Sequence, residues 1–121
     1  MSDILLIDDQ PYYDDMLAME MVDAGHRMTV LEDPELACET IKEIRPEIVL
    51  LDILIRGLDG FGVIMDIHAM AEPPPIIILT SYEDFKGDPR LTKTQGYLLK
   101  DIYVDRLLEK INEVIAVHSR Q

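Results

Sequence analysis

The stretch Ile4-Leu5-Leu6-Ile7-Asp8-Asp9 decides the fold class: it sets four apolar residues directly before two acidic ones. An apolar run without polar alternation is typical of a strand that is buried on both faces of a parallel sheet. Further runs rich in β-branched residues or leucine occupy residues 28–31, 48–51, 76–79 and 97–99. We therefore predict five strands, each buried or half-buried.

Amphipathic stretches separate these runs. The first begins at Pro11, a residue suited to a first helical turn, and stops before Gly25. Its expected core-facing residues lie about four apart: Tyr13, Leu17, Met21 and Ala24. A second helix is expected between Asp33-Pro34 and Pro46, a third after Asp59-Gly60, and a last one ending near Val117. Strands that alternate with helices predict the α/β class, with a parallel sheet covered on both faces.

The segment between the fourth and fifth strands is unsuited to an ordinary helix. Gly87 and Pro89 fall inside it, and a proline in a helix interior costs about 3 kcal/mol. Asp88 as the N-cap and Pro89 at the first helical position give a better start, but only residues 90–95 then remain. So short a helix is marginal without tertiary support. We therefore expect residues 81–88 to form a loop and the fourth helix to be short or distorted.

Composition excludes several classes of protein. Eleven Lys and Arg against 24 Asp and Glu give a net charge of −13, which argues against binding to nucleic acid or to an anionic membrane surface. The hydrophobic content of 48% supports a real core. Cys38 is the single cysteine, so no intrachain disulfide can form. With no secretory signal and no apolar run near the ~18 residues of a membrane helix, we expect a cytoplasmic protein.

Polar residues stand at the carboxyl ends of four predicted strands. The residues are Asp8 and Asp9, then Asp52, then Thr80 and Ser81, and finally Lys100. Ligands of open parallel sheets bind at this edge. Crowded carboxylates need a counter-charge, which Mg²⁺ can supply, while a lysine and a hydroxyl suit a phosphoryl group. Individually, Asp8 and Asp9 could cap a helix, Asp52 could lie in a turn and Lys100 could be solvated. Together they favour a phosphoryl-transfer site with a carboxylate nucleophile.

These residues, with Gly57-Leu58-Asp59-Gly60 and Gly96-Tyr97-Leu98-Leu99-Lys100, resemble the receiver domain of two-component response regulators, in particular single-domain chemotaxis response regulators. The resemblance covers residues 1–121, which we expect to form one receiver domain. It implies a flavodoxin-like, doubly wound (βα)5 fold whose five-stranded parallel sheet has the order 2-1-3-4-5. It implies no enzyme activity beyond self-phosphorylation and autodephosphorylation.

The resemblance also implies a role for each residue. Asp52 would accept a phosphoryl group from a histidine kinase or phosphotransfer protein. Asp8, Asp9, Asp52 and the backbone carbonyl of Leu54 would hold Mg²⁺, Lys100 and Thr80 would bind phosphoryl oxygens, and Thr80 and Tyr97 would form the switch. The surface around the fourth helix and fifth strand would change, to be recognised by a downstream protein or by a second copy in a homodimer.

Some positions depart from the family pattern. Arg56 and Asp101 replace prolines that many receivers carry. Leu54 and Tyr82 bring bulk and no group that could position a water, so we expect a long-lived phosphorylated state. On the first helix, Tyr12, Met16 and Met19 lie outside the expected core stripe, where they could dock the phosphodonor or pack against the last helix.

Other functions remain as alternatives. One is a receiver-like module that binds proteins without phosphorylation. A haloacid-dehalogenase-type phosphatase would need an Asp at position 54, and a P-loop NTPase would need a glycine-rich loop ending in Lys-Ser or Lys-Thr, which the chain lacks. In a flavodoxin, Asp8 and Asp9 would repel the flavin phosphate. We expect either a stand-alone receiver or a fragment of a longer protein.

Overall fold

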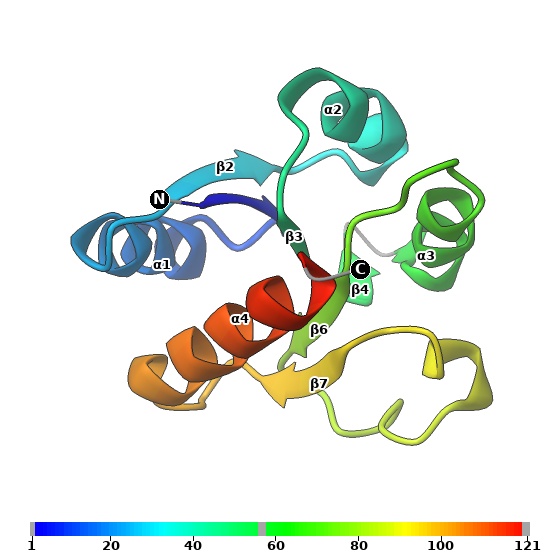
Figure 1. Ribbon diagram of the computed structural model, residues 1–121. Helices are drawn as coiled ribbons and strands as arrows, with labels where there is room; N and C mark the ends of the chain where they lie inside the picture. Colours follow the sequence, from blue (N-terminus) through cyan, green and yellow to red (C-terminus); the bar gives the residue numbers. More distant parts are fainter. Residues whose placement is uncertain (1, 56–57, 120–121) are drawn as a thin grey trace.

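The computed structural model describes residues 2–55 and 58–119. Five parallel strands form one sheet in the spatial order β2-β1-β3-β6-β7 (Figure 1). Their bounds are β1 Asp3–Ile7, β2 Arg27–Leu31, β3 Ile48–Leu51, β6 Ile76–Thr80 and β7 Gly96–Leu99. Counted along the chain among these five strands, the order is 2-1-3-4-5, so the predicted sheet is confirmed.

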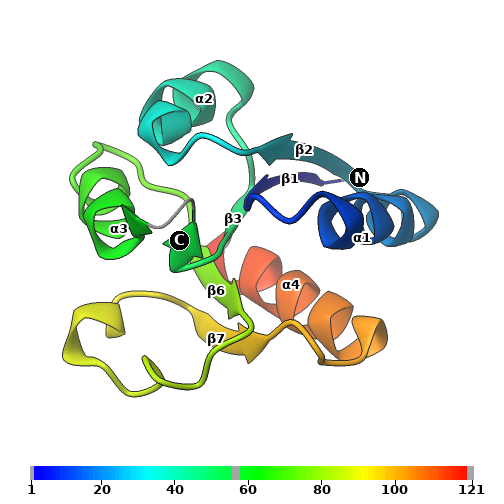
Figure 2. The same cartoon turned by 180° about the vertical axis from the view of Figure 1, so that it is seen from behind.

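Four α-helices cover the two faces of the sheet. They are α1 Pro11–Asp23, α2 Ala37–Ile44, α3 Phe61–His68 and α4 Val104–His118. Helices α1 and α4 lie on one face and α2 and α3 on the other (Figures 1 and 2). The second crossover opens with the 3₁₀ turn η1, Pro34–Leu36, where the Asp33 side chain accepts a hydrogen bond from the Glu35 amide at 3.0 Å. This is the cap-plus-proline start that the sequence predicted.

The core consists of two clusters, one on each side of the sheet. Within β1, Ile4 and Leu6 pack toward α1 and α4, whereas Leu5 and Ile7 pack toward α2 and α3. All four side chains are essentially inaccessible to solvent. A strand that must fill both clusters has no polar face, which is why its sequence shows no alternation.

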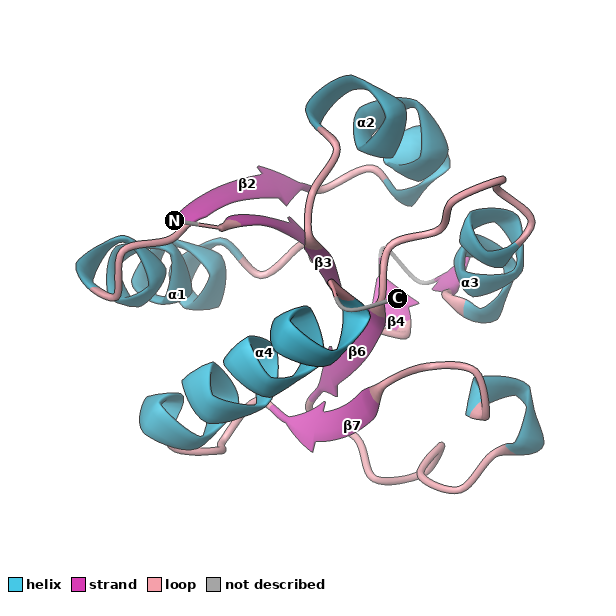
Figure 3. Cartoon of the chain, viewed as in Figure 1, coloured by secondary structure: helices cyan, strands magenta, loops and turns pink. Residues whose placement is uncertain are grey.

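The flavodoxin-like fold is confirmed, and so is the prediction that the fourth helix is short or distorted and that residues 81–88 form a loop: the fourth βα unit carries a single 3₁₀ turn in place of an α-helix. Residues 81–95 form a loop that contains one 3₁₀ turn, η2 Pro89–Leu91 (Figure 3). The start of this turn is as predicted: the Asp88 side chain accepts a hydrogen bond from the Arg90 amide at 2.9 Å, and Pro89 follows. Gly87, at φ +85°, takes a left-handed conformation that interrupts any regular helix. Phe85 and Leu91 pack onto the α2–α3 side of the sheet instead.

A short antiparallel pair follows β3 where the sequence predicted only a loop. It joins β4, Leu54–Ile55, to β5, Leu58–Asp59. Arg56 and Gly57 lie outside the described residues. Gly60 closes this turn with an N–H that donates to the Ile53 carbonyl at 2.6 Å, and a Cβ at position 60 would lie 2.7 Å from that oxygen. The turn after Asp52 therefore requires a glycine at this position.

Candidate functional site

The carboxyl edge of the sheet brings together four side chains that the sequence selected. Asp8 follows β1, Asp52 follows β3, Thr80 ends β6 and Lys100 follows β7. Asp8 and Thr80 are fully buried, and Asp52 is 4% exposed. The parallel topology places these strand ends beside one another, because β1, β3, β6 and β7 are consecutive neighbours in the sheet.

Lys100 links the two buried carboxylates. Its Nζ lies 2.7 Å from Asp8 Oδ2 and 3.0 Å from Asp52 Oδ2, and its side chain is 6% exposed. The same ammonium group donates to Gln10 Oε1 at 2.6 Å. Sequence reasoning missed Gln10, although its position directly after the acidic pair could have indicated it. The solvated lysine considered as an alternative is thus wrong for Lys100.

Burial and charge shift the pKa values of both partners. Burial raises the pKa of Asp52, and Lys100 opposes that rise through hydrogen bonding and charge. Burial alone would lower the pKa of Lys100, but the hydrogen bonds and charges of Asp8 and Asp52 outweigh it and raise that pKa. The lysine therefore stays protonated and serves as the counter-charge of the carboxylates.

The remaining carboxylate oxygens are oriented by backbone amides. Asp8 Oδ1 accepts from the Asp9 N–H at 2.9 Å, and Asp52 Oδ1 accepts from the Leu54 N–H at 3.2 Å. Asp9 itself is partly buried at the same edge. In the parts of the chain that the structure covers, no three acidic, histidine or cysteine side chains are grouped as metal ligands. Lys100 bridges Asp8 and Asp52 in this arrangement.

The two residues predicted to form the switch, Thr80 and Tyr97, lie on the neighbouring strands β6 and β7. The Thr80 hydroxyl is close enough to affect the pKa of Asp52, yet its buried Oγ1 has no hydrogen-bond partner. The half-buried Tyr97 packs against the α2–α3 cluster and donates its hydroxyl hydrogen to the Tyr82 carbonyl. A buried, unpartnered hydroxyl beside a carboxylate is poised to donate to a ligand at that carboxylate.

Comparison with known proteins identifies the family. Residues 4–112 match the family model of the response regulator receiver domain. The chain belongs to this family. It is a receiver domain of two-component response regulators, and such domains are generally signal transducers and not enzymes.

Relatives and solved structures agree with this assignment. Protein PilH of Pseudomonas aeruginosa is 32% identical over 96% of this receiver and 99% of PilH. The positive alginate biosynthesis regulatory protein of the same organism is 32% identical, but the receiver spans only 46% of its length. The response regulator TrrA of Thermotoga maritima, solved with Mg²⁺-BeF, is 28% identical at a TM-score of 0.86, covering 94% of this chain and 99% of that one. A structure of TrrA with the histidine kinase ThkA matches at a TM-score of 0.84 and 28% identity, covering 94% and 98%.

The receiver also carries an acidic residue that sequence reasoning missed. Asp14 on α1 is 2% exposed, and neither of its carboxylate oxygens has a hydrogen-bond partner. Burial, followed by the neighbouring Asp8, raises the pKa of Asp14 to about 8. The buried stripe of α1 consists of Asp14, Leu17 and Met21, whereas Ala24 is exposed. Asp14 lies three residues before Leu17, so both fall on the same face of a helix, and this spacing could have indicated that Asp14 is buried.

None of the helices in the described part of the receiver has the length and apolar character needed to cross a membrane.

Proposed function

We propose that Asp52 accepts a phosphoryl group from the phosphohistidine of a histidine kinase or phosphotransfer protein. An Asp52 oxygen attacks the phosphorus in line, an O–P bond forms, and the P–N bond to the histidine breaks. The observation that supports this role is the burial of Asp52 with its Oδ2 3.0 Å from Lys100 and the unpartnered Thr80 hydroxyl nearby. Lys100 then shifts a donor to a phosphoryl oxygen, and Thr80 donates to another.

The donor set fits Mg²⁺, which prefers carboxylate and carbonyl oxygens. The residues that would hold it are Asp8, Asp9, Asp52 and the carbonyl of Leu54. When bound, the ion would neutralise charge on the transferred group. The fit is supported by the buried Asp8 and Asp52, whose shared positive partner in this structure is Lys100. Self-phosphorylation and spontaneous hydrolysis at Asp52 are the reactions we propose for this domain.

The output surface differs from one built on a regular fourth helix, because that helix is reduced to the turn η2. We place the response on residues 81–95 and β7. Tyr97 connects them: it lies in β7, and its hydroxyl donates to the Tyr82 carbonyl in the loop. A movement of Thr80 toward the phosphoryl group would shift Tyr82, two residues later, and with it the loop. A downstream protein or a second copy of the chain would bind there.

Helix α1 offers a docking surface for the phosphodonor. Tyr12 is 92% exposed and Met19 is 70% exposed, so neither packs against α4, and that alternative is wrong for both. Met16, also exposed, lies between them. We expect the double substitution Tyr12→Ala and Met19→Ala to slow phosphotransfer from the cognate kinase, and Val22→Ala, farther along α1, to leave it unchanged. A wild-type rate in the double variant would contradict docking at α1.

Phosphorylation of Asp52 is tested by labelling with acetyl phosphate in the presence of Mg²⁺. Asp52→Asn should abolish the label while the circular dichroism spectrum stays that of wild type. Asp66→Asn, an exposed carboxylate on α3, is the matched control and should be labelled normally. Full labelling of Asp52→Asn would sink the assignment. A wild-type protein that neither takes the label nor binds beryllofluoride with Mg²⁺ would instead favour a module that works without phosphorylation.

We further propose that residues 1–121 act as one receiver domain in the cytoplasm. A lone, half-buried thiol at Cys38 supports a reducing compartment.

A further inference from the structure

Asp14 is an anomaly of the α1 core face. Its neighbours on that face, Leu17 and Met21, are fully buried and apolar, and a leucine would suit position 14 equally well. Burying a carboxylate without a hydrogen bond destabilises the folded state. Both oxygens of Asp14 are inaccessible and unpartnered. A residue that weakens the fold in this way is expected where the site gains something from it.

The Asp14 carboxyl group lies near residues of the phosphorylation site. After burial, Asp8 contributes most to the raised pKa of Asp14, Lys100 lowers that pKa, and Asp9 raises it. Lys100 does not neutralise Asp14 by hydrogen bonding, because its ammonium group already contacts Asp8, Asp52 and Gln10. Asp14 is therefore an acidic side chain at this edge that forms no ion pair with Lys100.

A helix-capping role does not account for this placement. Asp14 lies in the first turn of α1, but its side chain accepts no hydrogen bond from the first amides of the helix. The exposed Asp15, one residue later, would interact with the helix dipole equally well without the penalty of burial.

We propose that Asp14 is an additional carboxylate of the divalent-cation site, set against Asp8, and that it strengthens cation binding. The inference rests on the proposed Mg²⁺-dependent function. It concerns a residue on α1, outside the set formed by Asp8, Asp9, Asp52 and the carbonyl of Leu54. Cation affinity of oxygen sites rises with the number of charged ligands, and outer carboxylates that hold ligands or bound water also contribute to it. The unpartnered oxygens of Asp14 are available for either task.

The test is titration calorimetry of the purified domain with MgCl₂. Asp14→Asn keeps the shape and removes the carboxyl group that could ionise on binding the cation, and Asp15→Asn removes a carboxyl group on the exposed side of α1. We expect Asp14→Asn to weaken Mg²⁺ binding about tenfold and Asp15→Asn to change it less than about twofold. Equal affinities of the two variants would overturn the inference and leave the proposed function intact. A wild-type domain that binds no Mg²⁺ would overturn both.

Thermal unfolding supplies a second measurement that does not depend on how well the asparagine is accommodated. Asp14→Leu extends the apolar stripe, so it should unfold at a higher temperature than wild type in EDTA. Millimolar Mg²⁺ should then raise its unfolding temperature less than that of wild type. If Mg²⁺ raises the unfolding temperature of Asp14→Leu as much as that of wild type, Asp14 has no role in cation binding.

Discussion

Replacing Lys100 with methionine should reveal how far the buried charges depend on one another. The change keeps the length of the side chain and removes the ammonium group that lies 2.7 Å from Asp8 Oδ2 and 3.0 Å from Asp52 Oδ2. Two buried carboxylates are then left without a counter-charge. Breaking a buried ion pair by removing one partner is unfavourable by about 3–5 kcal/mol.

This free energy translates into a measurable shift. An unfolding entropy of about 2.1 cal/mol/K per residue gives roughly 0.25 kcal/mol/K for a chain of 121 residues. A loss of about 3 kcal/mol therefore lowers Tm by about 12 °C. We expect Lys100→Met to show this deficit in Tm relative to wild type in EDTA near pH 7.5, with unfolding followed by circular dichroism. Lys110→Met, which removes a lysine only 3.4 Å from Glu113 on the surface of α4, should shift Tm by less than about 2 °C.

Two further conditions test the electrostatic explanation. Burial already raises the pKa of Asp52, and without Lys100 that pKa should rise further. A carboxyl whose pKa is raised by folding stabilises the folded state less as pH rises, so the deficit should shrink near pH 5.5. Mg²⁺ should also reduce it by supplying the lost positive charge. A Lys100→Met protein within about 3 °C of wild type in EDTA, or a deficit that is the same at both pH values, would refute this reasoning.

Three other predictions follow from the same structure. Gly60→Ala places a Cβ 2.7 Å from a backbone oxygen and should lower the free energy of unfolding by about 2 kcal/mol in urea denaturation; an unchanged midpoint would show that the turn can relax. Tyr82→Ala and Leu54→Asn, at exposed positions two residues after Thr80 and Asp52 respectively, should each shorten the half-life of the acyl phosphate, and half-lives equal to that of wild type would contradict shielding. The contribution of Asp14 to metal-free stability should fall as pH rises from 3.8 toward about 8, since folding raises the pKa of Asp14 across that range, so wild type should lose stability relative to Asp14→Asn as pH rises.

The sequence predicted the sheet and the main site residues because both depend on local patterns. An apolar run such as 48–51 cannot be anything but a buried segment, and the residue after it must lie at the edge of the sheet. Pro89 with Asp88 likewise determines how a helical turn begins. These features need no information about distant parts of the chain.

The features that were missed depend on tertiary contacts. Tyr13 packs partly buried against the α1–α4 cluster, as predicted, but the adjacent Asp14 is buried as well. How α1 is rotated on the sheet decides this, and a preference for apolar residues does not reveal it. Gln10 belongs to the site because it accepts a hydrogen bond from Lys100, which lies 90 residues later in the sequence. A contact over that separation is not visible in a local pattern. The pair β4–β5 rests on two residues in each strand, too few to give an alternating pattern.

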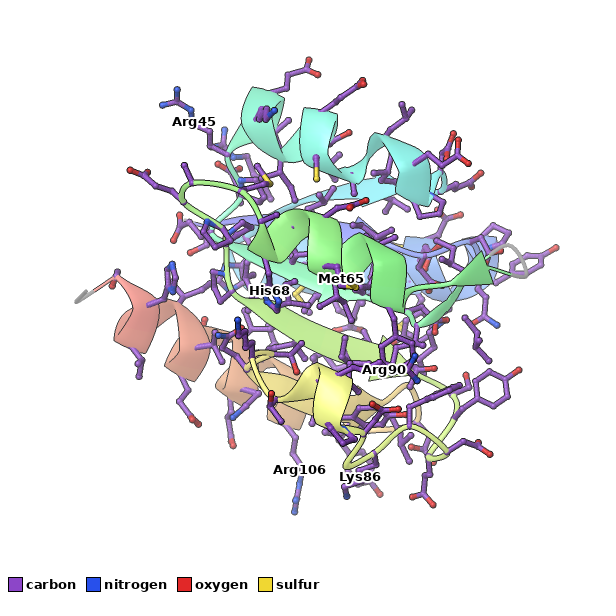
Figure 4. The ribbon with its side chains drawn as sticks, turned by 90° about the vertical axis from the view of Figure 1, so that its right-hand side faces the viewer. Arg45, Met65, His68, Lys86, Arg90 and Arg106 are labelled. Atoms are coloured by element: carbon purple, nitrogen blue, oxygen red, sulfur yellow. The ribbon has the colours of Figure 1, made fainter. Side chains whose placement is uncertain are left out.

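The packing of the helices in two layers has a consequence for assembly. The exposed residues of α1 belong to the layer that α1 forms with α4, whereas residues 81–95 pack with α2 and α3 on the opposite layer. Figure 4 faces this second layer, where Met65 on α3 and Arg90 in η2 lie on the same side of the molecule, and Arg90 stacks on Phe61. We therefore expect a phosphodonor on α1 and a target on the part of the loop around Phe85 and Leu91 to approach the domain from opposite layers. A ternary complex of donor, receiver and target would then form wherever the target leaves Tyr82 and Asp52 open to the donor.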